Sequence, residues 1–322
     1  MRESLIVNKH TIVPLYDFGS ALSGDLDLGD SCFITELPEN IFDNFLHYGR
    51  LWDKSGKTKV IDSFERDRFT TTYCLDHRYN GPESPHLSEP EAESKKKVRR
   101  IILGIQLLKV TMTSPEFIIH TQGEDYKAVD GLKTNERVFL VEAENISPEL
   151  FSEEDTAKLK VLWPRIYNIY DREGGKFNRI TNALDFFRVG LGMVAWQLRF
   201  AMFIIALESI YSTSNIEVTY SLSQRLAWFL GEDYEERLFY FEKAKKCYRI
   251  RSQIVHGDTV QGDLRKEIDN LMVDLEKMVR LTLLKILLND QLMEVFLNKR
   301  KLKDYFSALT LHEAKKNEKG GA

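Results

Sequence analysis

Hydrophobic residues in the first half of the chain occur in short runs, which predict β-strands. The runs are rich in β-branched and aromatic residues, and clusters of Gly, Asp and Asn separate them, as is typical of turns. The predicted strands lie at residues 5–7, 32–34, 70–73, 117–119 and 138–141.

Two other segments of this half have a different pattern. Apolar residues at Phe42, Phe45 and Leu46 predict a helix after Pro38, and residues 98–112 fit either a helix or a long strand. Residues 76–97 are polar, hold three of the eight prolines and end in a basic cluster. This segment predicts a mobile loop, whose lysines are either solvated or in contact with a phosphate backbone.

The second half has the three-to-four spacing of helices. Residues 177–187 and 189–211 form long apolar-periodic stretches, and Ser221 with Gln224 resembles a capping box that opens a short helix. Asp233 opens a longer helix that ends at Gly257, and a final amphipathic helix follows Asp263. The sequence therefore predicts an α+β chain, with a β-rich mixed domain at 1–146 and an all-α bundle with a C-terminal helical extension at 147–322.

Composition and charge narrow the class of protein. The chain has 322 residues, of which 43% are hydrophobic and 29% charged, with a net charge of -4. A nucleic-acid-binding surface would therefore be local. The three cysteines lie far apart and the N-terminus lacks an apolar signal segment, so we expect reduced thiols in a cytoplasmic protein. Arg199 interrupts the most apolar region, which predicts a core helix and no membrane span.

Candidate chemistry lies at the end of the helix that Gly257 terminates. Arg251 and His256 combine a permanent cation with a group that titrates near neutral pH, and such a pair can cleave RNA without a metal ion. With about 3.6 residues per turn, His256, Ser252 and Arg249 share one stripe, turned away from the apolar face. Arg251 lies about 140° around the helix from His256. This geometry favours a composite site formed by two copies across a twofold axis.

Three sequence blocks, in this order, resemble the HEPN superfamily and specifically its Apea-like branch. The resemblance covers roughly residues 175–290. The blocks are Ala-Leu-Glu-Ser-Ile-Tyr at 206–211, Arg-Leu-Ala-Trp-Phe-Leu-Gly at 225–231 and Tyr-Arg-Ile-Arg-Ser-Gln-Ile-Val-His-Gly at 248–257. The resemblance implies a dimeric helical bundle that acts as a metal-independent endoribonuclease without a cofactor, as in toxins, antiviral effectors and abortive-infection proteins.

The resemblance also assigns roles to residues of the last block. The family motif is an arginine, a polar residue and a final histidine, which correspond to Arg251, Ser252 and His256. His256 would transfer the proton of the ribose 2′-OH or protonate the leaving 5′ oxygen, and Arg251 would stabilise charge on the phosphoryl oxygens. The products would be a 2′,3′-cyclic phosphate and a 5′-hydroxyl. Serine departs from the Asn, Asp or His that more often follows the arginine. Ser252 and Arg249 are candidates for holding the RNA phosphate.

Other interpretations of the same residues remain open. Glu208 could pair with Arg251 or with Arg225 inside the bundle, which would give these three residues structural roles. The whole chain could instead be a non-catalytic HEPN module that binds RNA or a protein, or a scaffold that only dimerises. The N-terminal domain is either a sensor or regulator of the nuclease or a structural extension.

The remaining signals are weaker. Cys74, His77 and His86 have the spacing of half a zinc site, but no second half follows, which favours free polar residues. The sequence has no Walker loop or Rossmann fingerprint. Trp196 and Trp228 lie in apolar stretches and are predicted to be core residues.

Overall fold

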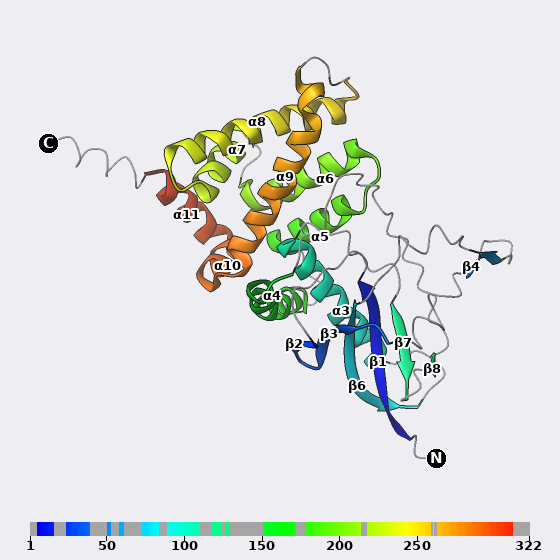
Figure 1. The fold of residues 1–322 in the computed structure, drawn as a ribbon. Helices are drawn as coiled ribbons and strands as arrows, with labels where there is room; N and C mark the ends of the chain where they lie inside the picture. The colour runs from blue at the N-terminus through cyan, green and yellow to red at the C-terminus, as the bar shows by residue number, and fades with distance from the viewer. Residues whose placement is uncertain are drawn as a thin grey trace. The chain divides into compact units, whose positions relative to one another are not determined.

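In a computed structural model, the chain divides into two compact units, Met1–Tyr167 and Asn168–Ala322. The predicted α+β class is confirmed, since a β-rich unit precedes a helical one (Figure 1). The structure describes residues 5–15, 24–38, 50–52, 58–60, 73–83, 89–109, 118–123, 127–128, 151–171, 178–213, 218–258, 260 and 263–311.

The first unit is built on a six-stranded antiparallel sheet of order β2-β3-β6-β1-β7-β8. Its central strands β1 and β6 pair along ten residues, from Ile6 opposite Pro82 to Leu15 opposite Tyr73. A separate hairpin joins β4 and β5. The strands are β1 (Ile6–Leu15), β2 (Leu26–Gly29), β3 (Cys32–Glu36), β4 (Arg50–Trp52), β5 (Thr58–Val60), β6 (Tyr73–Pro82), β7 (Ile119–Gln122) and β8 (Lys127–Ala128).

Two helices complete the core of this unit, α3 (Glu89–Leu108) and most of α4 (Glu153–Asp171). The ambiguous segment after residue 98 is therefore helical as far as Leu108. Trp163 of α4 packs into the core, and its indole N–H donates to the carbonyl of Leu28 at 3.0 Å. The apolar side chains at the centre of this core are Val13, Leu15, Ile34, Leu75, Val98, Ile101, Ile105, Phe151 and Leu159.

A group of buried polar side chains joins α3 to the sheet. Lys9 of β1 and Glu91 of α3 form an ion pair in which both side chains are fully buried. His77 Nδ1 of β6 lies 2.6 Å from Ser94 Oγ of α3. The prediction of a mobile loop over residues 76–97 is therefore wrong in the described part, which is strand to Pro82 and helix from Glu89. Its polar residues are paired across the sheet-helix interface.

The basic residues at 95–100, which were predicted to lie in a loop, are part of helix α3. Lys96 pairs with Glu93 at 3.1 Å, and Lys97 pairs with Asp30 at 2.5 Å. These lysines therefore have acidic partners within the unit, and the observed pairs give no support to the phosphate-contact alternative.

The stability of this unit should fall in acid because two of its histidines are buried as neutral groups. Burial is the largest cause that lowers the pKa of His77 and of His120 to about 4. The unfolded chain, with ordinary histidine pKa values near 6.5, binds protons that the folded state excludes. We expect the free energy of unfolding to decrease from about pH 6.5 towards pH 4. Urea unfolding of wild type and His77→Asn at pH 7 and pH 4.5 checks this, and equal losses in both proteins would exclude His77 as a cause.

The cysteine and histidine of the half zinc site do not face each other. Cys74 and His77 are three residues apart on β6 and therefore lie on opposite faces of the sheet. Cys74 packs with Ile12 and Ile119, whereas His77 contacts α3. His86 lies outside the described residues. In the described part of the chain, no group of three or more His, Cys, Asp or Glu side chains has a metal-site arrangement.

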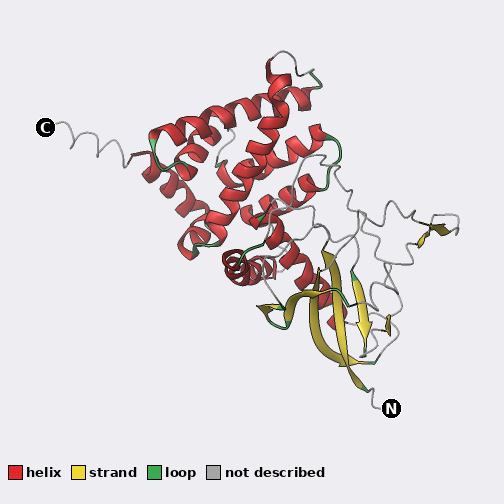
Figure 2. Cartoon of the chain, viewed as in Figure 1, coloured by secondary structure: helices red, strands yellow, loops and turns green. Residues whose placement is uncertain are grey.

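All described elements of the second unit after α4 are helices (Figure 2). The predicted helix from Asp233 to Gly257 is confirmed. The helix expected after Asp263 is also present, but it is not the final one, because two further helices follow it in the described part of the chain. The helices are α5 (Arg179–Leu191), α6 (Trp196–Tyr211), α7 (Val218–Leu230), α8 (Tyr234–His256), α9 (Asp263–Leu287), α10 (Asp290–Leu297) and α11 (Lys299–Leu311).

Two helix boundaries differ from those that the sequence predicts. The stretch 189–211 is not continuous, because α5 ends at a turn beginning with Gly192 and α6 starts at Trp196. Helix α7 starts at Val218, so Ser221 lies inside it, where its hydroxyl donates to the Val218 carbonyl at 3.3 Å. Trp196 and Trp228 are half-buried and not core residues; the Arg237 guanidinium lies 4.3 Å from the Trp228 ring.

A buried charge triad connects α6 to α9. Glu276 accepts from Arg199 of α6 at 2.7 Å and from Arg280, one turn along α9, at 2.5 Å. Burial raises the pKa of Glu276, but the two arginines more than offset this effect and leave its pKa lowered. The triad therefore fixes the register of two helices in the core.

The division between the units falls within α4. The expected division, at residue 146, lies outside the described residues, and the two compact units of the structure meet after Tyr167. The reason is that Leu159 and Trp163 of α4 belong to the core beneath the sheet, whereas Tyr170 donates to Asp185 of α5 at 2.8 Å.

All three cysteines are free and buried. Burial raises the pKa of Cys32 and Cys247 to about 12. Among the described residues, no helix combines the length and the apolar character that crossing a membrane requires.

Candidate functional site

Helix α8 carries the residues of the predicted motif, and both its ends are capped. Asp233 Oδ1 accepts from the Glu236 amide at 2.8 Å, which satisfies a free N–H of the first turn. Gly257 has a φ of 75°, the left-handed conformation that glycine adopts without strain, and its N–H donates to the Gln253 and Ile254 carbonyls. His256 is thereby held in the last turn of the helix.

The motif residues lie on different sides of α8. Ala244, Cys247 and Ile250 form its buried face. Arg249 and His256 are exposed, as the predicted stripe requires, and Ser252 is half-buried. The stripe thus faces solvent, within reach of a ligand or a second chain.

Arg251 points towards α6 instead. Its Nη2 atom lies 3.6 Å from Oε2 of Glu208, and the two side chains are 24% and 20% exposed. This contact is an ion pair but is too long for a good hydrogen bond. The sequence analysis offered Arg251 and Arg225 as possible partners of Glu208, and in the structure Glu208 contacts Arg251 and not Arg225. Arg251 Nε is buried and has no hydrogen-bond partner among the residues that the structure describes.

Tyr248 completes the surroundings of Arg251, and sequence reasoning missed its role. The Arg251 guanidinium lies 5.7 Å from the ring centroid of Tyr248. Burial raises the pKa of Tyr248, and the Glu208 charge adds to the effect. Tyr248 precedes Arg251 by three residues, and this spacing places both side chains on one side of the helix. The spacing was the signal in the sequence that could have indicated their contact.

Arg225 has a structural position at the end of α6. It donates to the Tyr211 carbonyl at 2.5 Å, and its guanidinium lies 4.9 Å from the Phe306 ring. Arg179 donates to the carbonyls of Ser209 and Ser212 at 3.0 and 2.5 Å. The two arginines thus satisfy carbonyls that the end of α6 leaves free, and they hold the turns next to Glu208.

A single chain does not bring Arg251 and His256 together. Arg251 contacts α6, whereas His256 is exposed at the end of α8, about 140° around the helix axis. One chain therefore presents the cation and the titratable group in different directions, as the sequence geometry predicted.

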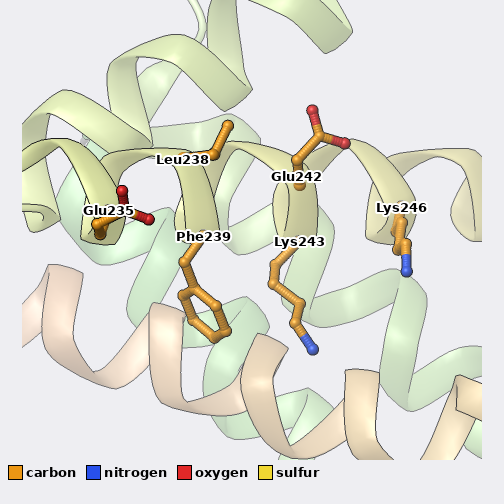
Figure 3. Close-up of a pocket in the computed structure, with 6 residues that line it drawn as sticks. All are labelled: Glu235, Leu238, Phe239, Glu242, Lys243 and Lys246. Atoms are coloured by element: carbon orange, nitrogen blue, oxygen red, sulfur yellow. The ribbon is translucent and has the colours of Figure 1, made fainter.

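A shallow groove of about 260 Å³ lies on the other half of α8, lined by Glu235, Leu238, Phe239, Glu242, Lys243 and Lys246. Phe239 and Lys243 point to the same side of the helix, with the ammonium 5.3 Å from the ring centroid (Figure 3). Lys243 and Lys246 pair with Asp274 and Glu267 of α9 at 2.6 and 2.7 Å. The groove ends about 15 Å before His256, from ten residues at 1.5 Å each. It is therefore separate from the motif.

Comparison of the chain with protein-family models, with curated proteins and with solved structures finds no match.

Proposed function

We propose that this protein is a metal-independent endoribonuclease of the HEPN type. One observation carries the proposal: His256 is exposed in the last, capped turn of α8, and Arg251, five residues earlier, keeps a guanidinium nitrogen without an acceptor among the described residues. The helix therefore offers a proton-transfer group and a cation with unused hydrogen-bonding capacity, the two functions that RNA cleavage needs.

In the proposed reaction, the ribose 2′ oxygen attacks the adjacent phosphorus and the bond from phosphorus to the 5′ oxygen breaks. His256 accepts the 2′-OH proton or delivers a proton to the departing 5′ oxygen. Arg251 stabilises the charge on the phosphoryl oxygens, while Ser252 and Arg249 hold the phosphate. The products are a 2′,3′-cyclic phosphate and a 5′-hydroxyl, and no metal or cofactor takes part.

The opposed directions of Arg251 and His256 support a homodimer with composite sites. In such a dimer, a twofold axis would place the arginine of one chain beside the histidine of the other. We further propose a role in antiviral defence or as a toxin-like effector in the cytoplasm. The sheet-containing unit would then sense the trigger or restrain the nuclease, or serve as a structural extension.

The test is cleavage of end-labelled single-stranded RNA by the wild-type protein in EDTA. We expect cleavage that persists in EDTA and leaves cyclic-phosphate ends, because the attacking group belongs to the RNA itself. An oligonucleotide of the same sequence with 2′-deoxyribose throughout should stay intact, since it lacks the nucleophile. Cleavage of both substrates, or its loss in EDTA, would contradict the proposed mechanism.

The alternative is a non-catalytic HEPN module that binds RNA or a protein. The Arg251–Glu208 ion pair favours it, because this pair links α8 to α6 and gives Arg251 a structural role. The module predicts RNA affinity that weakens as salt rises, without any cleavage. A scaffold that only dimerises predicts neither result.

A further inference from the structure

His256 lies at the end of a stripe of side chains that runs back along α8. Phe241, Lys245 and Arg249 precede it on the helix, and all three lie within about 60° of His256 around the axis. The stripe is about 22 Å long, from 15 residues at 1.5 Å each. Lys245, Arg249 and His256 are exposed, and Phe241 is half-buried. One surface therefore connects the proposed proton-transfer group with the first half of the helix.

The part of the stripe nearest to His256 is cationic. Lys245 and Arg249 lie four residues apart, one turn of the helix, and both reach solvent. Lys245 pairs with Glu242 at 3.6 Å, and the two side chains are 47% and 52% exposed. An exposed pair of this kind is weak, so the ammonium can exchange Glu242 for another anion at little cost. A phosphate backbone is the polyanion that such a row of cations attracts.

Aromatic rings lie beside these cations. Helix α7 packs along α8 (Figure 1), and Tyr220 of α7 meets Phe241 with the ring centroids 5.8 Å apart and the planes at 81°. The Lys245 ammonium lies 5.2 Å from the centroid of Phe241. Tyr220 is 55% exposed, so part of its ring faces solvent. Surfaces that bind single-stranded nucleic acid combine these two elements, cations for the phosphates and rings on which bases stack.

We propose that Tyr220, Lys245 and Arg249 bind single-stranded RNA along α8 and lead it to His256. The inference rests on the proposed function, in which Arg249 holds the phosphate next to His256. Lys245 then contacts a phosphate farther along the strand, and Tyr220 stacks on an unpaired base beyond it. A duplex fits this surface poorly, because its bases are stacked on one another and do not reach the tyrosine.

The test measures binding apart from catalysis. The probe is a fluorescein-labelled single-stranded DNA, which has the phosphates and bases but lacks the 2′-OH, and fluorescence anisotropy follows its binding to the full-length protein at several salt concentrations. Lys245→Ala should weaken binding and lower the slope of log affinity against log salt by about 0.7, the contribution of one phosphate contact to a single strand. The matched control is Lys243→Ala, the same change of charge about 160° around α8, which should bind as wild type does.

Tyr220→Ala should weaken binding about fivefold to a hundredfold, the usual effect of losing one stacked base, and leave the salt slope unchanged. Tyr220→Leu, which keeps apolar packing against Phe241, should show the same loss, whereas Tyr220→Phe should retain the affinity because it keeps the ring. A duplex of the same sequence should bind more weakly than the single strand, and equal binding of the two would contradict the stacking of Tyr220.

These results separate the binding surface from the nuclease. If wild type fails to bind the strand, or if Lys245→Ala and Tyr220→Ala bind it as tightly as wild type, the surface is overturned even in a protein that cleaves RNA. Affinity that falls in both variants of a protein that never cleaves RNA would support the surface and count against the nuclease.

Discussion

We expect His256→Ala to lower the rate of RNA cleavage by about 10²- to 10⁴-fold, the usual contribution of a general acid or base. The side chain is exposed at the end of α8, so its removal should change the free energy of unfolding by no more than about 0.5 kcal/mol. Initial rates on end-labelled RNA, together with urea unfolding, check both parts. Lys299→Ala, an exposed helical position at the start of α11, should leave the rate unchanged.

Mixing two inactive variants tests whether the site is composite. Arg251→Ala should also lose cleavage, but a heterodimer of Arg251→Ala and His256→Ala chains keeps one intact arginine-histidine pair across the twofold axis. Random exchange of chains forms such heterodimers as half of all dimers, each with one of two sites intact, so about a quarter of the wild-type activity should return. No recovery after verified exchange would place both residues in a site formed by one chain.

Glu276→Gln should lower the free energy of unfolding by about 3–5 kcal/mol, because it leaves two arginines in the core without their shared counter-charge. Arg199 and Arg280 both bind the Glu276 carboxylate, whose side chain is 10% exposed. The Arg280 guanidinium also lies 5.2 Å from the ring of Phe187, an apolar neighbour. Urea unfolding followed by far-ultraviolet circular dichroism measures the loss of the helices.

The matched control for this variant is Glu294→Gln. Glu294 pairs with Lys301 at the surface, where its side chain is 70% exposed, and such pairs contribute at most about 1 kcal/mol. Similar losses in the two variants would contradict the role of the buried triad.

The hydrophobic pattern predicts the fold class because it depends on local periodicity. Asp233 and Gly257 are local signals as well, and both ends of α8 were predicted from them. The error over residues 76–97 has a different origin. The polar residues of β6 and α3 are stabilised by partners far along the chain, such as Lys9 for Glu91, and no local pattern reveals a partner 82 residues away.

The same limit applies to the candidate site. Helical spacing predicts that Arg249 and His256 share an exposed stripe and that Arg251 lies apart from them. It does not reveal which arginine Glu208 contacts, because this depends on how α6 packs against α8. The position of a residue on one helix was predictable, and its contacts with other helices were not.

The position of α4 decides how the helical unit could be produced alone. A fragment that starts at residue 147 would carry Leu159 and Trp163 without the sheet and α3 that bury them, and such exposed apolar surface promotes aggregation. A fragment that starts near Asn168 omits these side chains and keeps Tyr170 with its bond to Asp185. Poor solubility of the longer fragment would therefore reflect the choice of its first residue and not an inability of the bundle to fold.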